Sequence, residues 1–370
     1  MLVAPQEFKG TLTASQAARA LERGLRAARP EWRTQRLPLA DGGPGTVDLV
    51  LAQVPGAQRR TTCVDDPLGR PVDATWAVLP PGDVAVVEMA QASGLSLLAP
   101  GERRPLDAST RGTGQLIRAA LDAGCRRVIV GAGGSATTDG GAGALSALGV
   151  RFLDEALRPL APTPRQLARC RFLHLALDPR LARTRLEVWT DVKSPLLGPS
   201  GAAHLYSRQK GATGWDAVFL EQTLRHLAAL APGGDGPGQA EAPGSGAAGG
   251  LAWGLLAVCG AALKPGFLSL AALVGLERAL DEADLVVTGE GRLDAQTAWD
   301  KGPWGLAHLA KRRGRRVVAF VGDSALPPRA WAARFDEVVR VGPPGRRPAA
   351  RLEVCARRWA ARAGPRRQTN

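Results

Sequence analysis

The sequence is poor in the residues that build metal and disulfide sites. Its 370 residues include 4 His and 5 Cys. The cysteines stand far apart and form no CxxC pair, which argues against a zinc knot and against a disulfide framework. The histidines show neither HxH nor HExxH spacing, so we expect no histidine-based metal site. Separate, unpaired cysteines favour the reducing cytoplasm as the location.

A targeting signal and a membrane segment are also lacking. The first residues, MLVAPQEFKG, have no basic region followed by a long apolar stretch, so we expect no signal peptide. The longest uncharged run lies between Glu241 and Lys264, and it contains six glycines. This composition indicates a loop that leads into a small-residue core helix, and no membrane partner is expected.

Lysine is scarce as well, because the 48 basic residues comprise 6 Lys and 42 Arg. The net charge of +14 is concentrated at one end, since residues 311–370 contain 16 Lys or Arg and 4 Asp or Glu. A non-enzymatic nucleic-acid binder that uses this basic C-terminal part is therefore one alternative function. The part shows no basic ladder interleaved with aromatics, and we expect no nucleic-acid partner.

What the sequence does contain is an alternation of apolar and amphipathic segments, which predicts an α/β fold. Thr13 begins a helix, with Gln16 placed to complete a capping box. Residues 61–92 hold strand-like runs separated by turn residues and predict a partly antiparallel, β-rich segment. Further strands are predicted at 2–5, 35–40, 126–130, 185–190, 284–288 and 316–322.

Two changes in composition predict domain boundaries. The β-rich character begins near residue 61, and residues 231–250 contain eight Gly and three Pro. We expect two α/β domains. Residues 1–60 and 265–370 would form a Rossmann-like domain whose parallel sheet is built from discontinuous segments. Residues 61–264 would form a second α/β domain with a mixed sheet.

Charged residues follow several predicted strands, at the edge where open α/β sheets bind ligands. Lys9, in FKG, precedes a helix start, where an ammonium group and free N–H groups suit a phosphate or carboxylate. Asp41, in ADGGPGT, follows a strand, and its glycines would let the backbone approach a ligand closely. An ordinary Asp-Gly turn is the alternative interpretation of that motif.

A glycine-rich loop, GAGGSATTDGGAG at 131–143, follows the strand at 126–130. Consecutive N–H groups in such a loop form an anion nest. Gly131, Gly133 and Ala136 also imitate a dinucleotide fingerprint, so a nicotinamide-dependent dehydrogenase is a second alternative. Asp139 falls where such a motif needs a regular helix, which weakens that alternative. The sequence contains no GxxxxGK[ST] and is not a P-loop protein.

The motif TGEGRLDAQ follows the strand at 284–288 and crowds Glu290, Arg292 and Asp294 into a predicted loop. Carboxylates of this kind bind Mg²⁺ together with phosphate oxygens and water. Asp191 occupies a similar position after the strand at 185–190. Phosphoryl transfer fits these residues, because it needs mainly charge neutralisation and positioning.

The chain resembles the bacterial glycerate kinases over almost its whole length, and Lys301 follows the last of the shared motifs. These motifs are APQEFKGTLTA, LPLADGGPGTVD, VEMAQASGL, STRGTGQLI, GGSATTDGGAGALSALG, TDVKSPLLGPSGAA, QKGAT, GSGAAGGL and VVTGEGRLDAQT. The resemblance implies a cytoplasmic enzyme that phosphorylates D-glycerate with ATP and Mg²⁺, with its active site in the cleft between two α/β domains. It favours 2-phosphoglycerate as the product, while the sequence leaves open whether O2 or O3 of glycerate is phosphorylated. It leaves the oligomeric state open, a homodimer included.

The resemblance also implies roles for individual residues. The catalytic candidates are Lys9, Asp41, Asp191 and Arg292. The nucleotide-binding candidates are Gly133, Gly134, Ser135, Asp139 and Lys301, and the metal candidates are Glu290 and Asp294. The chain departs from the usual family pattern at Gln6-Glu7, at Pro44 and at Lys193-Ser194-Pro195, beside several of these positions.

Overall fold

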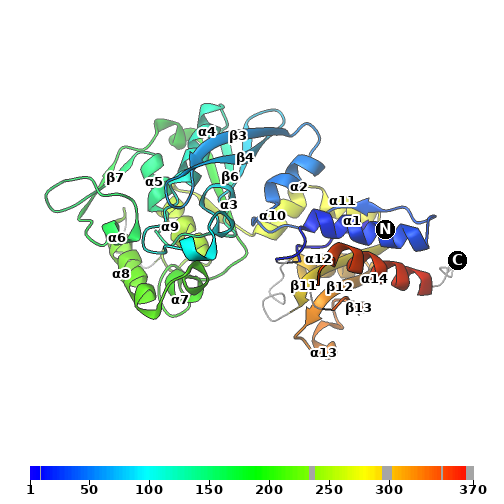
Figure 1. Cartoon of the computed structure of the whole chain (residues 1–370). Coiled ribbons are helices and arrows are strands. Elements are labelled where there is room, and N and C mark those ends of the chain that lie inside the picture. The colour runs from blue at the N-terminus through cyan, green and yellow to red at the C-terminus, as the bar shows by residue number, and fades with distance from the viewer. Residues whose placement is uncertain (9, 233–237, 294–301, 343–344, 364–370) are drawn as a thin grey trace. The chain divides into compact units, whose positions relative to one another are not determined.

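The computed structural model describes residues 1–8, 10–232, 238–293, 302–342 and 345–363 (Figure 1). Contacts divide the chain into unit 1, which comprises Met1–Ala40 and Leu270–Asn370, and unit 2, which comprises Asp41–Ser269. Each unit contains its own large sheet covered by helices. The predicted α/β class, with one sheet assembled from discontinuous segments, is confirmed.

Unit 1 contains a parallel five-stranded sheet in the order β13-β12-β11-β1-β2. Leu2 pairs with Val286, so the first and the late strands share one sheet, as predicted. The strands are β1 (Leu2–Val3), β2 (Gln35–Arg36), β11 (Leu285–Leu293), β12 (Arg316–Ser324) and β13 (Glu337–Arg340). β2 is shorter than predicted, although Leu37 and Leu39 still donate their N–H groups to Val3 (3.0 Å) and Pro5 (2.8 Å). Pro5, which follows β1, has no N–H group to donate in return.

Two long helices of unit 1, α1 and α14, lie side by side in Figure 1. α1 begins with the predicted capping box, in which Thr13 and Gln16 each accept the other's backbone N–H. Val287 and Phe320 belong to the core cluster formed with these helices. The helices are α1 (Ala14–Ala28), α11 (Leu276–Asp281), α12 (Gly302–Arg312), α13 (Pro328–Trp331) and α14 (Pro348–Arg362), while α10 (Gly266–Leu273) crosses the boundary between the units.

Unit 2 contains a mixed six-stranded sheet in the order β10-β9-β6-β5-β4-β3. β3, β4 and β5 pair antiparallel, which confirms the prediction for residues 61–92, and β5, β6, β9 and β10 run parallel. The strands are β3 (Gln58–Asp65), β4 (Pro71–Leu79), β5 (Val84–Glu88), β6 (Arg127–Gly131), β9 (Arg185–Trp189) and β10 (Ala262–Lys264). A separate hairpin pairs β7 (Val150–Leu153) with β8 (Phe172–Leu175).

Helices surround the sheet of unit 2 and share one apolar core with it, which includes Val87, Leu116, Val130 and Leu251. The helices are α2 (Thr46–Gln53), α3 (Ala90–Ser93), α4 (Arg111–Asp122), α5 (Ala142–Ala147), α6 (Pro164–Leu167), α7 (Ala202–Tyr206), α8 (Gly214–Leu230) and α9 (Ala247–Cys259). Short 3₁₀ turns are η1 (Leu95–Leu97), η2 (Pro100–Glu102), η3 (Pro179–Arg183) and η4 (Arg208–Lys210). Within the described parts of the chain, none of the helices is long and apolar enough to cross a membrane.

Two details differ from the sequence-based expectation. The first boundary between the units lies after Ala40 rather than near residue 60, because α2 packs on β4 and β5. The motif TGEGR also extends strand β11 instead of forming a loop. Glu290 pairs with Val321 and Arg292 pairs with Asp323, so β12 continues alongside it.

Candidate active site

The carboxyl ends of the parallel strands in unit 2 carry several of the predicted motifs. β5, β6, β9 and β10 end at Glu88, Gly131, Trp189 and Lys264. Parallel strands of an open α/β sheet place their ligand sites at this edge. The loop that begins at Asp41 lies at the same edge, although it comes from a distant part of the sequence.

The Asp41 loop and the glycine-rich loop touch through their backbones. Gly133 donates its N–H to the carbonyl oxygen of Gly42 (3.2 Å). Gly42 has a φ of 90°, and a Cβ there would lie 2.6 Å from the carbonyl oxygen of Trp189. Only glycine allows this close approach with this backbone conformation. The glycines after Asp41 therefore fit the loop against the ends of β6 and β9.

The structure brings the segments of Asp41 and Asp191 together around the start of α10. Asp191 accepts a hydrogen bond from the backbone N–H of Phe267 (3.0 Å). The neighbouring Gly266 donates its N–H to Thr190 (3.3 Å), and a Cβ at Gly266 would collide with the carbonyl oxygen of Asp41. The two predicted aspartates therefore belong to adjacent segments of one strand-end region.

The glycine-rich loop lies between two other site segments. Gly134 accepts an N–H from Leu95 (2.8 Å), and a Cβ at Gly134 would lie 2.9 Å from Cγ of Pro44. Ser135 is buried in this loop. Pro44, one of the departures from the family pattern, thus packs directly on a predicted nucleotide-binding residue. α5 begins only at Ala142, later than a dinucleotide fingerprint at 131–136 requires.

Asp139 is fully buried and is surrounded by donors from the protein. Its Oδ2 accepts from the N–H and the hydroxyl of Thr110 (2.7 and 2.8 Å) and from the N–H of Gly143 (3.1 Å). Its Oδ1 accepts from the N–H of Gly141 (3.1 Å). Burial raises the pKa of this carboxyl group, while these hydrogen bonds oppose the rise. The contacts give Asp139 a part in holding the loop, which differs from the nucleotide contact that the sequence suggested.

Lys210 is a site residue that sequence reasoning did not single out. Its side chain is 1% exposed, and Nζ donates to the carbonyl oxygen of Thr137 within the glycine-rich loop (2.6 Å). Burial lowers the pKa of the ammonium group to about 7, and the charge of Asp139 opposes this shift. The signal was present in the motif QKGAT, which carries part of the family resemblance.

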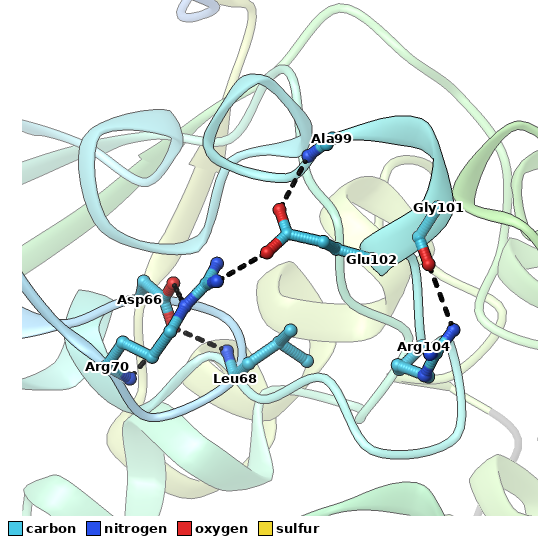
Figure 2. Close-up of polar contacts among 7 residues, drawn as sticks. All are labelled: Asp66, Leu68, Arg70, Ala99, Gly101, Glu102 and Arg104. Carbon is cyan, nitrogen blue, oxygen red and sulfur yellow. Dashed lines mark hydrogen bonds and ion pairs between the residues drawn. The ribbon is translucent and has the colours of Figure 1, made fainter.

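A network on the turn between β3 and β4 supports the segment that leads to Thr110. Figure 2 shows Arg70 between Asp66 (2.6 Å) and Glu102 (2.6 Å). Pro67 of the same turn accepts the backbone N–H of Ser109 (2.9 Å). Each ion pair of the half-exposed Arg70 contributes little alone, but with the buried Asp66 these contacts together fix Ser109, the residue that precedes Thr110.

Unit 1 contributes a second group of candidates at the end of β11. Glu290 is half-buried and Arg292 is exposed. Gln6 donates its backbone N–H to Gly289 (2.8 Å), so the segment before FKG runs beside the GEGR segment. Lys9, Asp294 and Lys301 lie outside the described residues. Among the residues that the structure describes, there is no group of three or more His, Cys, Asp or Glu side chains that could hold a metal ion.

The strand-end carboxylates and the glycine-rich loop suit the class of phosphoryl-transfer enzymes. A family model described as the glycerate kinase family matches residues 1–354. The glycerate kinase of Bacillus subtilis (strain 168) is 43% identical over 324 residues, which cover 87% of this chain and 85% of that protein. The glycerate 2-kinase of Escherichia coli (strain K12) is 39% identical with the same coverage. A solved chain assigned as glycerate kinase 2 from Salmonella typhimurium LT2 is 36% identical, with a TM-score of 0.79 and coverage of 97% of this chain and 96% of that one.

The chain therefore belongs to the glycerate kinase family. Membership makes it an enzyme, a kinase that uses ATP.

Proposed function

We propose that the enzyme transfers the γ-phosphoryl group of ATP to the 2-hydroxyl group of D-glycerate, with Mg²⁺ as the required metal. The observation that carries this proposal is the backbone contact between the Asp41 loop and the glycine-rich loop, with Asp191 on the adjoining segment. Carboxylates that accept a proton and amides that face phosphate oxygens thus come from neighbouring segments. The relatives named as glycerate kinases, one of them a glycerate 2-kinase, support the choice of substrate and position.

The acceptor side of the reaction is assigned to the two aspartates of unit 2. Asp191 and Asp41 orient the glycerate hydroxyl, and one of the two accepts its proton. The hydroxyl oxygen forms a bond to the γ-phosphorus while the bond from that phosphorus to the bridging oxygen breaks, and ADP leaves. The two aspartates could exchange roles, since both belong to the same strand-end region.

The donor side of the reaction is assigned to groups that neutralise phosphate charge. The amides of Gly134 and Ser135 bind phosphate oxygens, and Arg292 stabilises charge in the transition state. Gly133, whose N–H donates to Gly42, holds the glycine-rich loop in place beside them. Lys9 and Lys301 are further candidates for phosphate contacts. The interpretation requires the groups of both units to act in one reaction.

Magnesium is assigned to two acidic residues of the TGEGRLDAQ motif, Glu290 within β11 and Asp294. The half-buried carboxylate of Glu290 fits an ion that prefers oxygen ligands, and Asp294 is its candidate companion. When bound, the ion supplies charge neutralisation at the transferring phosphoryl group. We also propose a cytoplasmic location, which the five free cysteines support.

The test is an ATP-dependent assay on D-glycerate in which NMR identifies the product. We expect 2-phosphoglycerate and ADP in equal amounts, and no product with NAD in place of ATP. Formation of 3-phosphoglycerate would refute the assigned hydroxyl, and absence of any phosphoglycerate would refute the proposed reaction. A dehydrogenase or a nucleic-acid binder remains an alternative without support from the comparisons.

A further inference from the structure

Glu88 is a buried carboxylate at the edge of the unit 2 sheet, and neither the sequence motifs nor the proposed mechanism gives it a role. It is the last residue of β5, it pairs with Gly131 at the end of β6, and it is 1% exposed. Its Oε1 accepts the backbone N–H of Val47 (2.7 Å), and Gln91 donates to Oε2 (3.4 Å). The backbone N–H of Gly45 also bonds to this carboxylate.

These hydrogen bonds provide an acceptor for the free backbone N–H groups at the start of α2. The N-cap residue of α2 is Gly45, which has no side chain to accept the first free N–H groups of the helix. Glu88 supplies the missing acceptor from another element, 41 positions away in the sequence. A negative charge at this place is also favoured by the positive end of the helix dipole. Glu88 thus fastens the first turn of α2 to the end of β5.

The first turn of α2, which Glu88 holds, follows directly after the Asp41 loop. The loop contains Gly42 and Gly43 and so has little stiffness of its own. Thr46 closes it with a hydrogen bond from its hydroxyl group to the carbonyl oxygen of Gly43 (2.7 Å). The position of Asp41 therefore depends on where the first turn of α2 is held.

We propose that Glu88 is a positioning residue that keeps the Asp41 loop at the carboxyl edge of the unit 2 sheet. It acts through the backbone of Gly45 and Val47 and does not contact the substrate. The inference rests on the proposed role of Asp41 in the phosphorylation of glycerate. It assigns to Glu88 the geometry of the loop, whereas the chemistry stays with Asp41 and Asp191.

The strength of the hydrogen bonds between Glu88 and the first turn of α2 depends on pH near neutrality. Burial raises the pKa of Glu88 to about 7, and the hydrogen bonds from Val47 and Gln91 oppose the rise. The charge of Asp48 on α2 raises it further, although Asp48 is itself paired with Arg59 (3.1 Å). Below this pH, the protonated carboxyl group is a weaker acceptor for two backbone N–H groups. The loop is therefore held less firmly as the pH falls through 7.

The experiment compares wild type with Glu88→Gln, Glu88→Ala and the control Asp154→Asn. Asp154 is another buried carboxylate that holds a turn by two backbone N–H groups, those of Ala156 (3.0 Å) and Arg158 (2.9 Å). It follows β7, which lies at the opposite end of unit 2 from α2 in Figure 1. The control therefore shows how much kcat/KM and hydrogen exchange change when a buried, turn-holding carboxylate is lost elsewhere in unit 2.

Two readouts are measured for each variant from pH 6 to 8.5: kcat/KM for D-glycerate, and hydrogen exchange in a peptide that covers residues 41–50. In wild type we expect kcat/KM to fall and exchange to rise, relative to the intrinsic rate, as the pH drops through 7. Glu88→Gln should resemble low-pH wild type at every pH, because its amide oxygen still accepts but carries no charge. Glu88→Ala should lose roughly tenfold or more in kcat/KM, since small displacements of a reacting group are costly.

Unchanged exchange in Glu88→Ala, or a kinetic profile of Glu88→Gln that keeps the wild-type step, would overturn the role of Glu88. A loss of kcat/KM in Asp154→Asn as large as that in Glu88→Ala would overturn it as well. If hydrogen exchange changes in the Glu88 variants but wild type forms no phosphoglycerate, the proposed function is refuted. The role of Glu88 in holding the Asp41 loop would still stand. The two proposals can thus fail separately.

Discussion

Replacing Lys210 by Met should change how stability depends on pH. The folded protein lowers the pKa of this buried lysine from 10.5 to about 7. Between these two pH values the unfolded chain binds the extra proton, so the free energy of unfolding of wild type rises with pH and is lowest below pH 7. A shift from 10.5 to about 7 corresponds to ~5 kcal/mol over the whole window, of which about 2 kcal/mol falls between pH 7 and 9.

The neutral amine can still donate to Thr137, so the hydrogen bond survives the loss of the proton. Lys210→Met has no titrating group at this position and should lack this rise. The assay is urea unfolding of both proteins at several pH values, and the informative quantity is the difference in the free energy of unfolding. Lys311→Met, which removes a lysine that pairs with Asp336 in unit 1, controls for the loss of a lysine elsewhere. A difference that stays flat from pH 7 to 9 would refute the reasoning and would mean that Asp139 keeps the ammonium group charged.

Three further predictions concern the reaction. Lys9→Ala and Asp191→Asn should each lower kcat/KM at least about a hundredfold, because a transition-state charge contact contributes roughly 3–4 kcal/mol. The melting temperature of both variants should stay nearly unchanged. Near-full activity of both variants at saturating Mg-ATP would mean that the active site lies elsewhere. Glu290→Gln should raise the Mg²⁺ concentration needed for half-maximal rate, and an unaltered metal titration would remove it from the metal site. Deletion of residues 364–370 should leave kinase activity largely intact, and loss of most activity in a folded protein would contradict this.

Local sequence signals predicted the elements that local physics determines. The capping box at Thr13 and the alternating strands around 61–92 appear where the residues indicated. The strand at 35–40 was predicted too long because the apolar run does not show that Pro5, on the neighbouring segment, has no N–H group for the ladder. The boundary near residue 60 was wrong because α2 gains its packing from β4 and β5, which follow it in the sequence.

The candidate site contains residues that the sequence motifs identified and residues that they did not. The motifs identified Asp41, Asp191 and the glycine-rich loop, because glycines and acids after strands are visible in the sequence. They did not reveal that Asp139 faces Thr110, or that Glu88 and Lys210 brace two loops. Those partners lie 29, 41 and 73 positions apart, and only the folded chain brings them together. A buried charged side chain needs partners for its charge, and the sequence alone does not show which residues those partners are.

The insertion of unit 2 into unit 1 has a consequence for biosynthesis. The hydroxyl of Thr288 on β11 bonds to Ala4 beside β1, a separation of 284 positions. Residues 1–40 thus leave the ribosome well before β11, the strand that pairs with β1. Domains generally fold as units during synthesis, and distant pairings form slowly. When residue 269 has been synthesised, every strand of the unit 2 sheet is present, whereas the unit 1 sheet still lacks β11, β12 and β13, the last of which ends at Arg340.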